Sequence, residues 1–386
     1  MINLKPNSST FEITPQKRTR VPVVHQFWKI SIAFGLLIGF PTGLYLWLQL
    51  SGQIEHVESY AYLMNLHATS QLIVFFGLFI LGFVYTAGYH LNGGQARPIK
   101  HIFWVLPAIA VGYILYLIPP VTMLGKLMMS ASFAYTGLMM FGAAKEGNFS
   151  KPVITTLCLP GLVTFAAAPW LQLTDINIAF FAVMTGPFFF VLMAGNQLIP
   201  NVMKGNRLEG KPGWIFIFLI AIAYLLIGYS TFISDVNPVL IALSFILPAI
   251  VYLFGVGFFK ALNHCGPTSL SIAFIAGFSW FFVTMILLAI HGETFMENAL
   301  HLIILGQVMT HVIAVGARVI GFFSGDHAIS DARLTWMVLL WQLVPFTRGL
   351  DAIIDFPSGT AWITTAVTVA VLLPWSVLML ARIRKV

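Results

Sequence analysis

Charged residues are scarce in this chain: only 9% of its 386 residues are charged, whereas 59% are hydrophobic. The chain also has only two cysteines, Cys158 and Cys265. One lies inside an apolar run and the other in a predicted loop, which excludes a thiolate metal cluster and makes a disulfide implausible. No acidic residue falls in the middle of an apolar run. This absence argues against a proton-relay pump or a proton-coupled carrier.

Long apolar runs are what the chain has in abundance. Runs of about 20 residues are long enough to cross a hydrocarbon layer of ~30 Å, so the sequence predicts an all-α membrane protein with about twelve transmembrane helices. We place the spans at 28–50, 62–89, 101–118, 121–143, 152–171, 175–200, 213–233, 238–262, 268–291, 298–322, 334–353 and 359–381. Because the loops are short, residues 28–383 are expected to form a single transmembrane domain. The polar N-terminal tail, 1–27, lacks the hydrophobic core of a secretory leader.

Basic residues collect on one side of the predicted spans. Most of the 20 lysines and arginines lie in the N-terminal tail, in loops after even-numbered spans, or at the C-terminus. The positive-inside rule places these parts, and therefore both termini, in the cytoplasm. We expect a multi-pass protein of the bacterial cytoplasmic (inner) membrane, in contact with the lipid bilayer. The net charge of +7 reflects this topology, so no nucleic-acid partner is expected.

Three similar segments recur at intervals of four spans. The second, sixth and tenth spans end with LGFVYTAGYHLNG, AGNQLIPNVMKGN and GARVIGFFSGDH. Each passes from a small residue and a few apolar ones into a polar exit that contains glycine. The recurrence predicts three pseudo-equivalent four-helix units. The alternative is coincidence, because glycine is frequent in membrane helices generally.

Two histidines lie at matching depths in spans that run in the same direction. His67 is about five residues inside the second span and His301 about three residues inside the tenth, which corresponds to ~8 Å and ~5 Å of helix. Hydrocarbon penalises an ionisable side chain, so each histidine is a functional candidate. Two imidazoles in one layer can ligate a haem held between two helices, with one ligand from each helix. The alternative is that each imidazole hydrogen-bonds a neighbouring helix carbonyl.

Two further histidines extend the set of candidate metal ligands. His291, at the outer end of the ninth span, falls in the same layer as the first pair. His311 lies ten residues beyond His301, which is ~15 Å deeper along the helix. It therefore either ligates a second centre or makes a buried polar contact with Gln307 or Thr310.

Two cations and two glycines complete the predicted haem environment. Lys126 and Arg348 are basic yet lie near the outer face, where they are candidate partners for haem propionates. Arg348 could equally pair with Asp351, three residues further along its helix. Gly77 and Gly306 are the positions at which a porphyrin could approach the helix backbone closely.

Three segments resemble a known family, the NnrS proteins. HATSQ followed by GFVYTA is similar to that family's first motif, and NQLIPNVMKGN to its central motif. ALHLIILGQVMTHVIAVGARVIGFFSG is similar to its last motif, with His301, Arg318, Val319 and Gly325 at matching positions. The resemblance implies a twelve-span membrane protein that contains haem and copper and takes part in the nitric oxide response. It also implies a general likeness to the haem–copper oxidase core.

The chain departs from the family motifs at several positions. Thr69 and Ser70 stand where the family has a histidine and an acid, and Gln197 stands where it has an arginine. A haem site through His67 and His301 survives these departures. A copper site does not clearly survive, because His291 and His311 are too few for a three-imidazole copper centre beside a haem.

We therefore expect a membrane protein that binds b-type haem near its outer face and helps the cell to handle or resist nitric oxide or a related small ligand. Whether it is an enzyme stays open. One alternative is a cofactor-free transporter of a small solute that uses buried polar residues, namely Asn196, Gln197, Gln307 and Gln342. Another is a non-catalytic assembly or regulatory protein whose histidines are structural.

Overall fold

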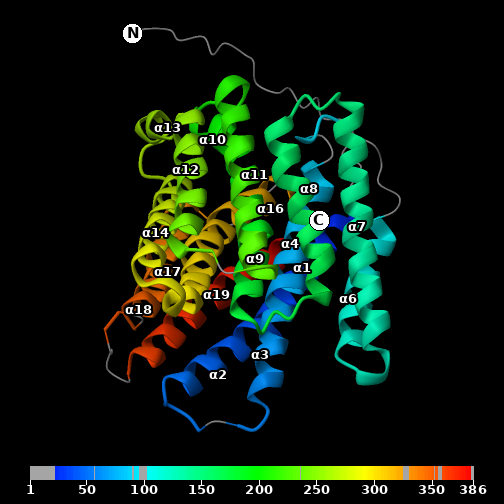
Figure 1. Cartoon of the computed structure of the whole chain (residues 1–386), viewed down its shortest axis with the longest axis vertical. Coiled ribbons are helices and arrows are strands. Elements are labelled where there is room, and N and C mark those ends of the chain that lie inside the picture. The colour runs from blue at the N-terminus through cyan, green and yellow to red at the C-terminus, as the bar shows by residue number, and fades with distance from the viewer. Residues whose placement is uncertain are drawn as a thin grey trace.

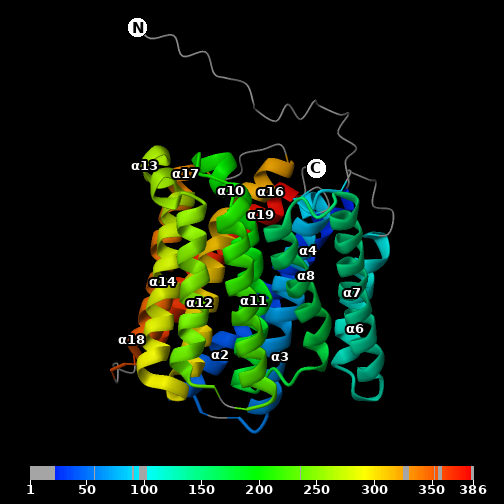
Figure 2. The same cartoon turned by 45° about the horizontal axis from the view of Figure 1, so that its top comes forward.

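The protein is a bundle of helices that stand side by side (Figures 1 and 2). The computed structural model describes residues 22–55, 57–88, 91–94, 102–234, 236–324, 330–351, 353–354 and 359–383. These ranges contain no β-strand, which confirms the predicted all-α fold. Residues 1–21 of the predicted N-terminal tail lie outside them, and the first helix begins at Pro22, before the predicted boundary at 28.

The bundle combines α-helices with short π-helical and 3-10 segments. The α-helices are α1 (Pro22–Phe34), α2 (Phe40–Leu50), α3 (Tyr60–Thr69), α4 (Gly77–Phe83), α6 (Ile102–Tyr116), α7 (Thr122–Glu146), α8 (Pro152–Ala167), α9 (Ile176–Thr185), α10 (Pro187–Met203), α11 (Gly210–Phe232), α12 (Pro238–Gly255), α13 (Phe258–Cys265), α14 (Ser269–His291), α15 (Met296–Leu302), α16 (Ala317–Ser324), α17 (Asp331–Trp341), α18 (Leu343–Asp351) and α19 (Thr360–Ile383). The π-helical segments are η1 (Gly35–Gly39), η2 (Ser70–Phe76), η3 (Val84–Gly88), η7 (Ile303–Met309) and η8 (Val312–Gly316). The 3-10 segments are η4 (Pro119–Val121), η5 (Ala168–Trp170) and η6 (Gly292–Phe295).

Nine helical segments of the described chain are long and apolar enough to cross a membrane. One of them, Ser269–Gly321, covers two predicted spans: α14 and the segment from α15 to α16 lie against each other. The chain reverses between them at Gly292, whose φ of +65° suits glycine. The predicted span 101–118 corresponds to a shorter apolar helix, α6, and the span 334–353 to α17 and α18. The protein is therefore a multi-pass membrane protein.

Spans two, six and ten are the inner helices of the bundle. In Tyr60–Gly88 and Ile176–Met203, 83% and 89% of the most apolar stretch is enclosed by other helices. In span ten, residues 306–314 are all buried. Span six joins the other two, because α10 contacts both α4 and η7, and α9 contacts α15. The three spans that end in similar segments are thus all central in the described part of the bundle.

Spans two and ten also share a local backbone irregularity. A seven-residue π-helical turn, η2, begins three residues after His67, and another, η7, begins two residues after His301. π-helical turns are rare and often mark functional sites. Span six is interrupted differently: α9 ends at Thr185, Gly186 follows, and Pro187, which has no backbone N–H, starts α10. The helices that carry the two histidines are therefore built alike.

Candidate functional site

A cavity of about 310 Å³ lies among the ends of spans one, two, six, ten, eleven and twelve. It occupies the end of the bundle at which α2 and α3 lie, the lower end in Figure 2. Its volume is in the range of small-molecule sites. The walls are mainly apolar, with a few polar side chains among them. The apolar lining includes Phe40, Leu44, Leu46, Met64, Leu72, Leu300, Ile304 and Val344.

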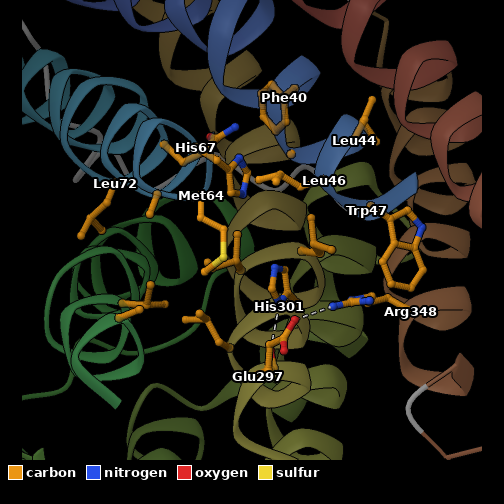
Figure 3. Close-up of a pocket in the computed structure, with 18 of the residues that line it drawn as sticks. Phe40, Leu44, Leu46, Trp47, Met64, His67, Leu72, Glu297, His301 and Arg348 are labelled. Atoms are coloured by element: carbon orange, nitrogen blue, oxygen red, sulfur yellow. Dashed lines mark hydrogen bonds and ion pairs between the residues drawn. The ribbon is translucent and has the colours of Figure 1, made fainter. Parts of the chain in front are cut away.

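His67 enters the cavity from α3 (Figure 3). Its Nδ1–H donates to the backbone carbonyl of Gly39 at 2.9 Å. A carbonyl only accepts, so the proton is on Nδ1 and Nε2 keeps its lone pair. Gly43 makes room for the ring, because a Cβ there would lie 2.7 Å from His67 Nδ1 and closer still to Cε1. A glycine at position 43 is therefore required for this imidazole position.

His301 enters the same cavity from α15, on a different wall from His67 (Figure 3). Its Nδ1–H donates to the carbonyl of Glu297, one turn earlier, at 2.8 Å. Both rings therefore have the same tautomer, and neither Nε2 has a hydrogen-bond partner among the residues the structure describes. The predicted contact with a carbonyl of a neighbouring helix is present for His67, whereas His301 bonds a carbonyl one turn earlier in its own helical segment. Either bond leaves the other nitrogen available, as in most metal-bound histidines.

Arg348 of α18 lines the cavity close to His301. Its guanidinium carbon lies 3.8 Å from the centre of the Trp47 ring. Its Nη2 pairs with the carboxylate of Glu297 at 3.2 Å, and the side chain is only 9% exposed. Glu297 thus binds Arg348 through its carboxylate and His301 through its carbonyl. The pairing with Asp351 involves a side chain outside the described part of the chain.

Lys126 does not line the cavity of the two histidines. Its Nζ lies 5.6 Å from the Trp170 ring centre and 6.0 Å from that of Tyr116. These residues line a neighbouring hollow, which shares Tyr60, Met64 and Thr174 with the main cavity. Lys126 therefore lies beside the site and not in its wall.

The other two candidate ligands lie away from the cavity. His291 is exposed at the end of α14, with its ring 5.8 Å from that of Phe295. His311 is buried and donates from Nδ1 to the carbonyl of Gln307 at 2.6 Å, whereas its Nε2 has no partner among the described residues. Across the described ranges, no three side chains of His, Cys, Asp or Glu gather to form a metal cluster.

The structure corrects the predicted role of two glycines. A Cβ on Gly77 would lie 2.7 Å from the Phe133 ring, and a Cβ on Gly306 would lie 2.5 Å from Trp280. Both glycines therefore make room for aromatic side chains of neighbouring helices. The prediction that they admit a porphyrin was wrong, because spacing along a helix does not show what faces each position.

Sequence reasoning missed three residues of the site: Gly43, Trp47 and Glu297. Glu297 carried a detectable signal, since it precedes His301 by one helical turn and so lies on the same face. The stacking of Trp47 on Arg348 and the space at Gly43 depend on contacts between helices, and no local pattern marks them.

Two of the polar residues considered for a transporter are engaged in internal hydrogen bonds. Asn196 accepts from the backbone N–H of Leu208 at 2.9 Å. Gln342 accepts from Trp280 Nε1 at 2.9 Å and donates to Thr310 and to the carbonyl of Val338. These bonds connect neighbouring segments and so give both residues a structural role.

The fold and the cavity define an all-α, multi-pass membrane protein with two imidazoles and a buried arginine in one apolar chamber. The sequence profile of the NnrS protein family matches residues 32–385, nearly the whole chain. The chain therefore belongs to the NnrS family. Among functionally curated proteins, none matches it.

Proposed function

We propose that the cavity binds a b-type haem through His67 and His301. The observation that carries this proposal is the matched pair of imidazoles, each with Nδ1–H held by a backbone carbonyl and Nε2 left without a partner among the described residues. Neutral imidazole of this tautomer is a common axial ligand of haem iron. The apolar lining suits the faces of a macrocycle. The residues present thus fit the group that family membership implies.

Arg348 is the proposed partner of a haem propionate. A guanidinium is always charged and binds carboxylates in a bidentate manner. Stacking on Trp47 and pairing with Glu297 hold it beside the cavity. Lys126, in the adjoining hollow, is the second candidate for this role. We leave His291 and His311 out of the ligand set, and copper with them, because both lie away from the cavity.

We infer from family membership that the protein serves the response to nitric oxide or nitrosative stress. The distribution of basic residues supports a place in the bacterial inner membrane with both termini in the cytoplasm. Haem, when bound, would supply a redox-active iron able to bind a small diatomic ligand. The protein side chains hold the two ligating nitrogens, supply a cation for a carboxylate and exclude water with apolar walls.

Replacement of each histidine tests the proposal. Purified wild-type protein is expected to show a Soret band, and His67→Ala and His301→Ala are expected to weaken or abolish it. His291→Ala, at an exposed position, is the matched control and is expected to retain the band. Thermal denaturation of each variant separates loss of ligand from loss of fold. Folded His67→Ala and His301→Ala proteins with wild-type spectra would refute the assignment.

A further inference from the structure

A second, smaller hollow lies deeper in the bundle, between spans one, two, six and ten. Its volume is about 70 Å³. Its walls are almost entirely aromatic and aliphatic, and His311 is its one ionisable lining residue. The lining side chains that define its shape are Trp28, Phe79, Ile80, Phe190, Val191 and Val312. Five of these six side chains are buried and Phe79 is half-buried, so the hollow is built mainly from core side chains.

The hollow continues the cavity of His67 and His301 along the same three inner helices. On span six, Ala179 and Val183 line the cavity, and Pro187 and Val191 line the hollow. Ala179 and Val183 belong to α9, and Pro187 and Val191 belong to α10 beyond the break at Gly186, so the two spaces follow one another along span six. Phe76 of η2 lines both spaces and forms the boundary between them.

The chemistry of the walls restricts what this hollow can hold. Apolar cavities stay dry, because a buried water needs two to four polar partners, and they bind apolar molecules such as xenon. A bare ion would lose its hydration without compensating ligands. A volume of about 70 Å³ is also far below the ~300 Å³ of ordinary ligand sites, which excludes a macrocycle or a metabolite.

We propose that this hollow is a binding site for a small uncharged molecule of two or three heavy atoms, next to the histidine cavity. Such a molecule partitions readily into a bilayer and needs no hydrogen-bond partner. The site brings it within one side chain, Phe76, of the cavity. The binding claim does not depend on haem, so it stands or falls separately from the proposed function.

Xenon is the probe that tests the proposal. Crystals of the full-length protein pressurised with xenon are expected to show an anomalous peak between Val312 and Phe190. Val312→Phe fills the hollow and is expected to abolish the peak. Val283→Phe makes the same change on the exposed face of α14, where Val283 is 44% exposed, and is expected to keep it.

Val312→Ala provides a test that does not depend on tolerance of a larger side chain. It removes two methyl groups from the wall, so xenon occupancy is expected to rise above that of the wild type. Absence of xenon from the hollow in both wild-type and Val312→Ala crystals would overturn the proposal. Undiminished xenon in Val312→Phe crystals would do so as well.

Discussion

Replacement of Gly43 by alanine is the sharpest probe of how the site is built. The added methyl group would overlap the His67 imidazole, with Nδ1 at 2.7 Å and Nε2 at 3.2 Å from the new carbon. The ring is held by a hydrogen bond to Gly39 and cannot turn away without breaking it. Alanine at position 43 therefore displaces the proposed ligand without removing it.

The expected cost follows from ordinary overpacking. Inserting a methyl group into a packed site costs about 1–3 kcal/mol, and loss of the Gly39 hydrogen bond adds about 0.5–1.5 kcal/mol where the ring moves. If the overpacking cost of about 1–3 kcal/mol is lost from the free energy of haem binding, haem affinity drops roughly 5- to 150-fold. The assay is a haem titration of the purified apoprotein followed by absorbance, with thermal denaturation of the same samples.

Gly142→Ala is the matched control for this substitution. Gly142 is in α7, and a Cβ there would meet no atom within 4 Å. Alanine in a helix is favoured over glycine by about 1 kcal/mol, so this variant is expected to be as stable as the wild type or more stable, with unchanged haem affinity. If Gly43→Ala protein bound haem with wild-type affinity and spectrum, the reasoning about the His67 position would be wrong.

Two further substitutions test charged side chains at opposite ends of the bundle. Arg348→Lys keeps the charge but loses planar stacking on Trp47. In the same titration we expect haem affinity to fall about fivefold, a loss of roughly 1 kcal/mol. Equal affinity of variant and wild type would exclude Arg348 from the haem site. Asp331→Asn weakens an ion pair with Arg318 and a 2.6 Å hydrogen bond from Ser269, and we expect it to lower stability by about 1 kcal/mol. Glu209→Gln is the control, because Glu209 is in an exposed ion pair with Lys151, and we expect it to lower stability by less than half as much as Asp331→Asn does. Equal losses of stability in Asp331→Asn and Glu209→Gln would contradict a stabilising role for the Asp331 contacts.

Much of the fold could be predicted from the sequence, because hydrocarbon imposes a strong and local constraint on each span. Apolar length predicted the all-α membrane fold, which the structure confirms. Spans two, six and ten, which share exit motifs, are all inner helices of the bundle; the repeat of three four-helix units stays a prediction. The break at Gly186 and Pro187 was not predicted, since each residue alone is common in membrane helices. The π-helical turns carry no recognised sequence signal.

The site could be predicted only in part. The sequence predicted that His67 and His301 lie at equal depth in parallel spans, because depth follows directly from position along a helix. Both side chains line the same cavity in the structure. The direction of a side chain around the helix axis does not follow from position alone. For this reason Gly306 was expected to face a porphyrin, whereas it faces Trp280. The partner of Arg348 depends on how α15 approaches α18, a contact between helices that no single segment specifies.

The central claim is that one haem is bound between His67 and His301. The most direct measurement is the absorption spectrum of full-length protein purified from haem-replete cells, combined with iron and copper analysis of the same sample. The account predicts a Soret band, about one iron per chain, and loss of both in the double variant His67→Ala/His301→Ala. A colourless wild-type protein without iron, or a double variant that keeps both band and iron, would contradict it.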